Sequence, residues 1–308
     1  GAYGAAMFHL FTHAFFKALL FLCAGSVIHA MSDEQDMRKM GGIWKLIPWT
    51  YALMWIGSLA LGGIPFFAGY YSKDIILESA FAAHTGAGTY AFWLGVGAAM
   101  MTAFYSWRLL IMTFHNETRA DHETYHHVHE SPWVMLVPLI VLALGAVFAG
   151  WLYYDAFVGE HMEAFWGASI LFAVPHHAHE VPLWVKLAPL VVGIAGIALA
   201  YLFYMFRTDL PGKLAGAMGG LYRFLLNKWY FDELFEATLV EPAKKLGFGL
   251  WKGGDGKIID GLGPDGIASV SQDVARQATR LQSGYVYHYA FAMLIGVVIL
   301  ITWYMFWW

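Results

Sequence analysis

Charge is scarce in this sequence. Charged residues make up 13% of the 308 positions, whereas a soluble globular domain has about 25%. Hydrophobic residues make up 59%, and the mean hydropathy is +0.54. This composition excludes an ordinary soluble domain. It predicts an all-α integral membrane protein whose helices face lipid or one another.

Several common chemistries are missing as well. Cys23 is the single cysteine and lies in an apolar run, which excludes a disulfide framework and a cysteine metal site. The sequence has no glycine-rich phosphate loop in a strand–helix setting and no Ser-His-Asp arrangement. The formal net charge of -4 argues against nucleic acid as a partner. We therefore expect no redox cofactor, nucleotide or metal in this chain.

Long apolar runs are plentiful. A bilayer-crossing helix needs about 20 mostly apolar residues. Six segments meet this need, at 4–30, 46–71 continuing past Ser72, 89–114, 132–157, 183–206 and 286–307. The second is irregular because Gly62, Gly63 and Pro65 interrupt it. Such a break is tolerated where protein or a water cavity surrounds it, so we predict two half-helices, the second beginning near Ser72.

Basic residues set the expected orientation. They occur in the segments 32–45, 107–131 and 207–284, and the last holds ten of the 18 Lys and Arg residues. The segments 74–107 and 132–185 contain no Lys or Arg. Alternating crossings place the three basic segments on one side, which we assign to the cytoplasm or the mitochondrial matrix.

The segment 207–284 is too long for an ordinary connection. Apolar residues recur in it at helical spacing, as at Ile267, Val270 and Val274. Glycines at 253–256 and 261–266 interrupt the pattern. We predict a broken amphipathic lateral helix along the cytoplasmic surface. It either folds back on its own bundle or straps neighbouring subunits together, and the pattern alone slightly favours the first.

Three ionisable residues share one apolar helix. His9, His13 and Lys17 follow an i, i+4, i+8 pattern, so they lie on one broad stripe that rises about 12 Å. Histidine titrates near neutral pH, and ionisable groups at membrane depth usually mark an ion path. A structural alternative is that they bond backbone groups or neighbouring helices. Three on one stripe favour a proton relay completed by water.

Lys73 and Asp74 follow the break in the second segment. Ser72 is a candidate N-cap of the second half-helix, whose dipole would favour Asp74. Lys73 is then a candidate proton site that responds to a nearby carboxylate. The alternative is an interface anchor that reaches water. Glu78, one turn later, belongs either to the same path or to a polar exit.

The remaining histidines predict less. They cluster in two loops, at His122, His126, His127 and His129 and at His176, His177 and His179. Their spacings match no strong metal pattern, so we expect solvated loop residues. A haem held by His9 and His13 is disfavoured, because two ligands one turn apart on one helix cannot hold opposite faces of one haem.

Two motifs carry a resemblance. The run HLFTHAFFKALLFL at 9–22 and the run GGIPFFAGYYSKD at 62–74 resemble the antiporter-like subunits of respiratory complex I and of multisubunit sodium/proton antiporters. The later runs NKWYFDEL at 227–234 and YVYHY at 285–289 resemble the distal subunit type, called chain L in bacteria and NADH dehydrogenase subunit 5 in mitochondria. The resemblance covers nearly the whole chain.

The resemblance implies an arrangement of the chain. Residues 1–115 would end the second antiporter-like repeat, with the broken helix at 46–87, and 116–206 would form two further transmembrane helices. Residues 207–284 would form the lateral helix and 285–308 a transmembrane anchor. Because Gly1 opens directly into an apolar stretch, we expect no signal peptide and a chain that begins inside a longer protein. A glutamate and a lysine of the first repeat would then lie upstream.

The resemblance also implies a function. The residues His9, His13 and Lys17 would belong to a central hydrophilic axis, and Lys73 and Asp74 to the proton exit. The chain would be a proton-translocating subunit of NADH:ubiquinone reductase without its own redox site. FMN, iron–sulfur clusters and quinone would reside in other subunits. Its partners would be other membrane subunits and lipid, in the bacterial inner membrane or the mitochondrial inner membrane. The alternative is a subunit of a sodium/proton antiporter.

Overall fold

The computed structural model describes residues 2–170 and 181–307. Within these ranges the chain is helical and contains no β-strand. It divides into two compact units, Gly1–Ala217 and Met218–Trp308. The prediction of an all-α protein is therefore confirmed for the described residues.

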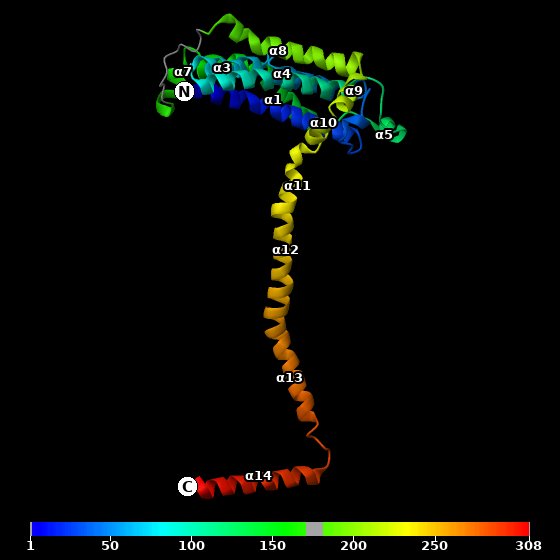
Figure 1. Ribbon diagram of the computed structural model, residues 1–308, viewed down its shortest axis with the longest axis vertical. Coiled ribbons are helices and arrows are strands. Elements are labelled where there is room, and N and C mark those ends of the chain that lie inside the picture. The colour runs from blue at the N-terminus through cyan, green and yellow to red at the C-terminus, as the bar shows by residue number, and fades with distance from the viewer. Residues whose placement is uncertain (1, 171–180, 308) are drawn as a thin grey trace. The chain divides into compact units, whose positions relative to one another are not determined.

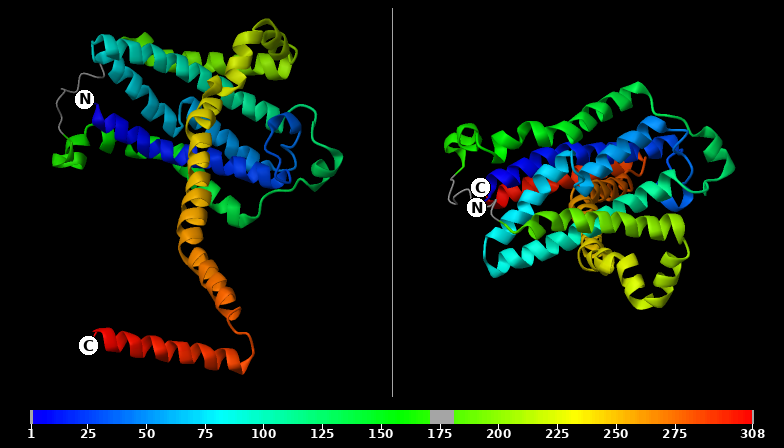
Figure 2. Two further views of the ribbon diagram at one scale, coloured as in Figure 1. Left: turned by 60° about the horizontal axis from the view of Figure 1, so that its bottom comes forward. Right: turned by 90° about the horizontal axis from the view of Figure 1, so that it is seen from above.

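The first unit is a bundle of helices that lie side by side (Figures 1 and 2). Its α-helices are α1 Tyr3–Ala30, α2 Pro48–Gly62, α3 Ala68–Ala82, α4 Gly86–Phe114, α5 His122–His127, α6 Trp133–Val158, α7 Met162–Trp166, α8 Leu183–Tyr201 and α9 Leu210–Ala217. Short 3-10 turns lie at Met37–Lys39 and Gly167–Ser169, and a π-helical turn at Leu202–Phe206. Helix α1 packs against α2, α3 and α6, and α4 packs against α8.

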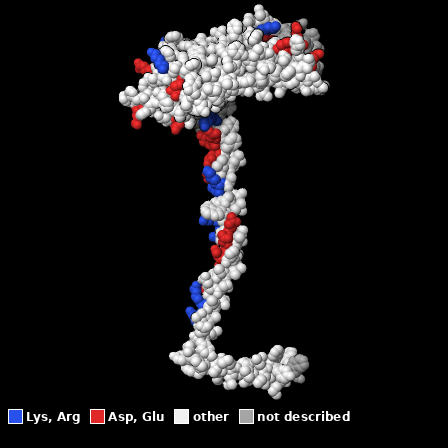
Figure 3. Space-filling model, turned by 180° about the vertical axis from the view of Figure 1, so that it is seen from behind, with Lys and Arg blue, Asp and Glu red and all other residues white. Residues whose placement is uncertain are grey.

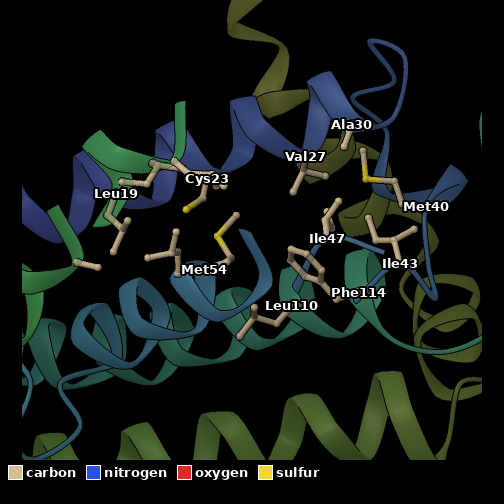
Figure 4. Close-up of a cluster of buried hydrophobic side chains, with 14 of the residues drawn as sticks. Leu19, Cys23, Val27, Ala30, Met40, Ile43, Ile47, Met54, Leu110 and Phe114 are labelled. Carbon is tan, nitrogen blue, oxygen red and sulfur yellow. The ribbon is translucent and has the colours of Figure 1, made fainter. Parts of the chain in front are cut away.

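Apolar side chains from α1, α2 and α4 fill the core of this bundle. Cys23 of α1, Met54 of α2 and Leu110 and Phe114 of α4 are buried and point toward one another (Figure 4). Long apolar side chains such as Phe21, Val134 and Leu183 are instead exposed on the outside of the bundle. An apolar exterior around a packed apolar core is what a bilayer requires of its helices.

The break predicted in the second segment lies between Gly62 and Ala68. Gly63 adopts a left-handed conformation with φ of 73° and caps α2, as glycine commonly does at this position. The predicted start of the second half near Ser72, with Ser72 as N-cap, is wrong. Helix α3 begins at Ala68 after Phe67, and the Ser72 hydroxyl donates to the Ala68 carbonyl one turn earlier, at 3.2 Å.

A close helix contact explains the earlier start. A Cβ atom on Gly69 would overlap the Ala60 carbonyl oxygen of α2. The glycine therefore lets the first turn of α3 press against the last turns of α2, and the chain resumes its helix as soon as it has passed Pro65. The second half-helix consequently places Ser72, Lys73 and Asp74 in its second turn rather than at its end.

Five helices of the described residues are long and apolar enough to cross a membrane: Tyr3–Ala30, Gly86–Phe114, Trp133–Val158, Leu183–Phe206 and Val286–Trp307. The two halves of the broken segment have 15 residues each. Each is therefore about 22 Å long, less than the roughly 30 Å hydrocarbon core of a bilayer. Neither half crosses a bilayer alone.

The second unit is a series of helices with exposed apolar side chains. It contains α10 Gly219–Leu226, α11 Phe231–Phe235, α12 Glu241–Gly249, α13 Pro264–Thr279 and α14 Val286–Trp307, with a 3-10 turn at Lys228–Tyr230 and π-helical stretches at Glu236–Val240 and Leu250–Asp260. Ile267, Val270 and Val274 of α13 are each at least 60% exposed. Charged residues run along one side of these helices in the view of Figure 3.

The breaks in the amphipathic region differ from those predicted. Gly253, Gly254 and Gly256 lie inside the π-helical stretch Leu250–Asp260, which continues α12 without a break. The break within the predicted stretch 261–266 falls at Gly263, directly before Pro264 opens α13. An interior glycine costs a helix only about 1 kcal/mol, whereas proline removes a backbone donor and clashes with the preceding turn.

Candidate functional site

The stripe on α1 is half-buried within the bundle. The rings of His9 and His13 lie 5.5 Å apart, centroid to centroid. His13 interacts electrostatically with Lys17, whose Nζ lies 5.9 Å from the centre of the Phe21 ring. The three residues therefore form one connected row on α1, as the spacing predicts.

A hydroxyl pair joins α1 to α3. The Nδ1 atom of His9 lies 3.0 Å from the Ser72 Oγ, and the Thr12 hydroxyl donates to the same oxygen at 2.7 Å. Thr12 and Ser72 are fully buried. Sequence reasoning missed Thr12, although it lies one turn before Phe16 on the inner face of the same helix. The pair fixes the second turn of α3 against the histidine row.

Lys73 reaches back across the break. Its Nζ donates to the Gly62 carbonyl at 3.0 Å, and Gly62 is the last residue of α2. The last carbonyls of a helix lack intrahelical donors and carry the negative end of its dipole. The ammonium group of one half-helix therefore stabilises the end of the other.

Asp74 is buried, with 5% of its surface exposed. No donor among the described residues hydrogen-bonds either of its carboxylate oxygens. Its charge interacts with those of Lys73 and Glu78. A buried carboxylate without a hydrogen bond is costly, and such groups concentrate at sites that take up protons, ions or water.

The ionisable row on α1 and the pair Lys73 and Asp74 on α3 form one series. His9 of α1 interacts electrostatically with Lys73 of α3 as well as with His13. The structure thus brings all five predicted residues into one chain of neighbouring ionisable groups, in the order Lys17, His13, His9, Lys73 and Asp74. Each of the five residues therefore interacts electrostatically with at least one other member of the series.

A second polar cluster lies at the other end of α2. The Glu130 carboxylate accepts hydrogen bonds from the Trp49 N–H at 2.7 Å, the Thr50 N–H at 3.3 Å and the Thr50 hydroxyl at 2.6 Å. Ser26 of α1 lies 2.7 Å from the Thr50 hydroxyl and 2.6 Å from the Ser131 hydroxyl. A carboxylate at a helix N-terminus satisfies free N–H groups and complements the dipole. Glu130 was not predicted, because 80 residues separate it from Thr50.

The loop histidines are arranged as follows. His122 and His126 are exposed, and their Nε2 atoms lie 3.0 Å apart. The described residues contain no group of three or more side chains placed to hold a metal ion. His176, His177 and His179 lie outside the described residues.

Two family models match the chain. Residues 1–102 match the family described as "NADH:quinone oxidoreductase/Mrp antiporter, TM", and residues 105–305 match "NADH dehydrogenase subunit 5 C-terminus". The first match contains all five residues of the ionisable series. The second contains α6, α8 and nearly all of the second unit.

Related proteins extend this result. NADH-quinone oxidoreductase subunit L of Rhodobacter capsulatus is 46% identical over an alignment of 374 positions. This alignment covers 98% of this chain and 52% of that protein. NADH-ubiquinone oxidoreductase chain 5 of Marchantia polymorpha is 43% identical, and the alignment covers 97% of this chain and 46% of that protein. The chain thus spans about half the length of the curated relatives it matches. The resemblance predicted from the motifs is confirmed, and the chain belongs to the family of NADH dehydrogenase subunit 5.

Proposed function

We propose that the chain is part of a proton-translocating membrane subunit of NADH:quinone oxidoreductase. The observation that carries this proposal is the continuous series of ionisable groups from Lys17 to Asp74, half-buried or buried among apolar helices. Ionisable side chains at such depth are costly and mark ion or proton paths. The names of the relatives support the same assignment.

Protons pass along this series in steps. The path leads from Lys17 through His13 and His9 to Lys73 and Asp74. Pairing and separation of Lys73 and Asp74 change how tightly each holds its proton, so a shift of charge along the membrane arm loads and empties the path. Electron transfer supplies that shift from other subunits, which hold FMN, iron–sulfur clusters and quinone.

The membrane arrangement is part of the proposal. The half-helices α2 and α3 cross the membrane together, so the chain has six crossings. The basic loops lie on the cytoplasmic or matrix side of the bacterial or mitochondrial inner membrane. Residues 1–115 end an antiporter-like repeat, 116–206 add two crossings, 207–284 form the lateral element and 285–308 the anchor.

The coupling ion distinguishes the two candidate functions. In inverted membrane vesicles that contain the complete complex with its full-length subunit, NADH oxidation is expected to acidify the lumen in sodium-free buffer. A pH-sensitive dye reports this, and a protonophore should abolish it. Vesicles from cells without the subunit serve as control. An imposed sodium gradient that moves protons without NADH would instead support the sodium/proton antiporter.

The lateral element gives a second test. We propose that the exposed apolar face of α13 contacts neighbouring antiporter-like subunits and so straps them together. Val274→Pro should cost this helix about 3 kcal/mol and loosen the association of the subunits, whereas Val274→Ile keeps both the helix and the face. Native electrophoresis after detergent extraction measures the intact fraction. Equal fractions for both variants would show that the strap is dispensable.

A further inference from the structure

A cavity of about 610 Å³ opens between α3, α6 and α8. Asp74 and Glu78 of α3, Tyr154 and Asp155 of α6 and Lys186 of α8 line it. A water molecule occupies about 30 Å³ in the liquid, so the cavity has room for a cluster of waters. The polar groups around it supply the hydrogen bonds that such waters need.

Glu78 lies beside Asp74 in this cavity. The two residues are four positions apart on α3, which places them on one face of the helix with Cβ atoms about 5–6 Å apart. Glu78 is half-buried, and its charge interacts with those of Asp74 and Lys186. Asp74 lines the same cavity, although its two carboxylate oxygens are buried and have no hydrogen-bond donor among the described residues.

Asp155 differs from Glu78, although both carboxylates line the cavity. Asp155 is held by a short contact with His161 and by the Glu160 N–H at 2.8 Å. Its charge is therefore committed to groups at the end of α6. The charge of Glu78 interacts with that of Lys186, which comes from another helix. Of the two, Glu78 is the carboxylate free to exchange a proton with Asp74.

The cavity lies at one end of the first unit. Residues 70–78 of α3, the C-terminal end of α6 and the N-terminal end of α8 line it. The basic segment 107–131 leads into the N-terminal end of α6, the end of that helix opposite the cavity. A proton that leaves Asp74 toward this cavity therefore moves away from the basic side.

We propose that Glu78 is the proton-transfer residue that follows Asp74, and that Lys186 is its positioning residue. The inference rests on the proposed function. The protonated Asp74 side chain turns toward the cavity, gives its proton through cavity water to the Glu78 carboxylate and returns to the anion. Glu78 then gives the proton to water at the mouth of the cavity. The positive charge of Lys186 in the same cavity favours the anionic form to which Glu78 returns.

Paired variants of the complete complex in membrane vesicles test this. Glu78→Gln is expected to lower NADH-driven proton pumping about tenfold. A positioned proton-transfer group accelerates its step roughly 100-fold or more, but other steps also limit the overall pumping rate. Lys186→Met should lower pumping less. The double variant should pump as Glu78→Gln alone, since the lysine acts through the glutamate. Glu163→Gln, at an exposed position of α7 outside the cavity lining, is the control and should pump normally.

Two results would overturn the inference. One is wild-type pumping by Glu78→Gln, and the other is a double variant whose loss equals the product of the two single losses, as independent structural damage would give. Lys73→Ala, measured in parallel, distinguishes failure of the proposed proton-translocating function from failure of the inference about Glu78. If Lys73→Ala abolishes pumping and Glu78→Gln does not, only the inference about Glu78 fails.

The opening of the cavity is tested by accessibility. A cysteine introduced by Glu78→Cys, or by Ile75→Cys in the same lining if the first does not assemble, should react with a membrane-impermeant cationic thiol reagent. Labelling of this chain is expected from the side opposite NADH oxidation. Cys23 is buried, and Ala99→Cys at a buried position of α4 serves as control. Absence of labelling from that side would contradict the proposed opening.

Discussion

Lys73→Ala and Asp74→Ala are each expected to reduce proton pumping about tenfold or more while the complex still assembles. Lys73 makes its hydrogen bond to the Gly62 carbonyl, and the loss of a charged hydrogen bond costs about 1.5–3 kcal/mol. Removal of a half-buried charge offsets part of that cost. Proton uptake per NADH in vesicles, with native electrophoresis for assembly, measures both effects.

Lys73→Arg sharpens the same experiment. Arginine keeps the positive charge and the donor to Gly62, but its guanidinium group does not release a proton in proteins. This variant should assemble normally and still fail to pump. Lys45→Ala, at an exposed loop position, is the control for a lost lysine. Wild-type pumping by Lys73→Arg would show that the lysine acts only as a fixed charge.

Gly63→Ala is expected to have the second large effect. Gly63 has φ of 73°, a conformation that costs other residues about 1–2 kcal/mol. A Cβ atom there would overlap the Lys73 Nζ and lie 2.9 Å from its Cε and 3.9 Å from an Asp74 carboxylate oxygen. The methyl group therefore displaces the ammonium from the Gly62 carbonyl, and we expect pumping to fall nearly as far as in Lys73→Ala.

Gly97→Ala is a matched control, because a Cβ atom at Gly97 of α4 meets nothing within 4 Å. Alanine also favours a helix over glycine by about 1 kcal/mol. Pumping and thermal stability of both variants, measured side by side, separate a local effect at Lys73 from a general effect of the added methyl. If the two variants show equal pumping and equal thermal stability, Gly63 has no specific role in placing Lys73.

Local sequence patterns predicted the elements better than their contacts. The row of His9, His13 and Lys17 follows from helical periodicity alone, and the break follows from the two glycines and Pro65. The start of α3 did not follow, because it depends on how closely Gly69 approaches Ala60 of α2. That contact is a property of the packed bundle.

The contacts that complete the site join residues far apart in the sequence. Ser72 meets Thr12 across 60 positions, and Glu78 and Lys186, which are still farther apart in the sequence, line one cavity. A single lysine in the apolar run of α8 gives no periodic signal of its partner. Such pairs are set by which helices neighbour one another in the bundle, and one sequence does not specify this.

Helix α2 is held at both ends by ionisable groups from other parts of the chain. The Glu130 carboxylate binds its first N–H groups, and the Lys73 ammonium binds its last carbonyl. When Lys73 gives up its proton, its hydrogen bond to the last carbonyl of α2 weakens, while the hydrogen bonds of Glu130 to the first N–H groups remain. Deprotonation at one end of α2 thereby loosens a rigid helix that stays anchored at its other end. Loss of the proton can therefore affect the far end of α2 without a proton moving along the helix.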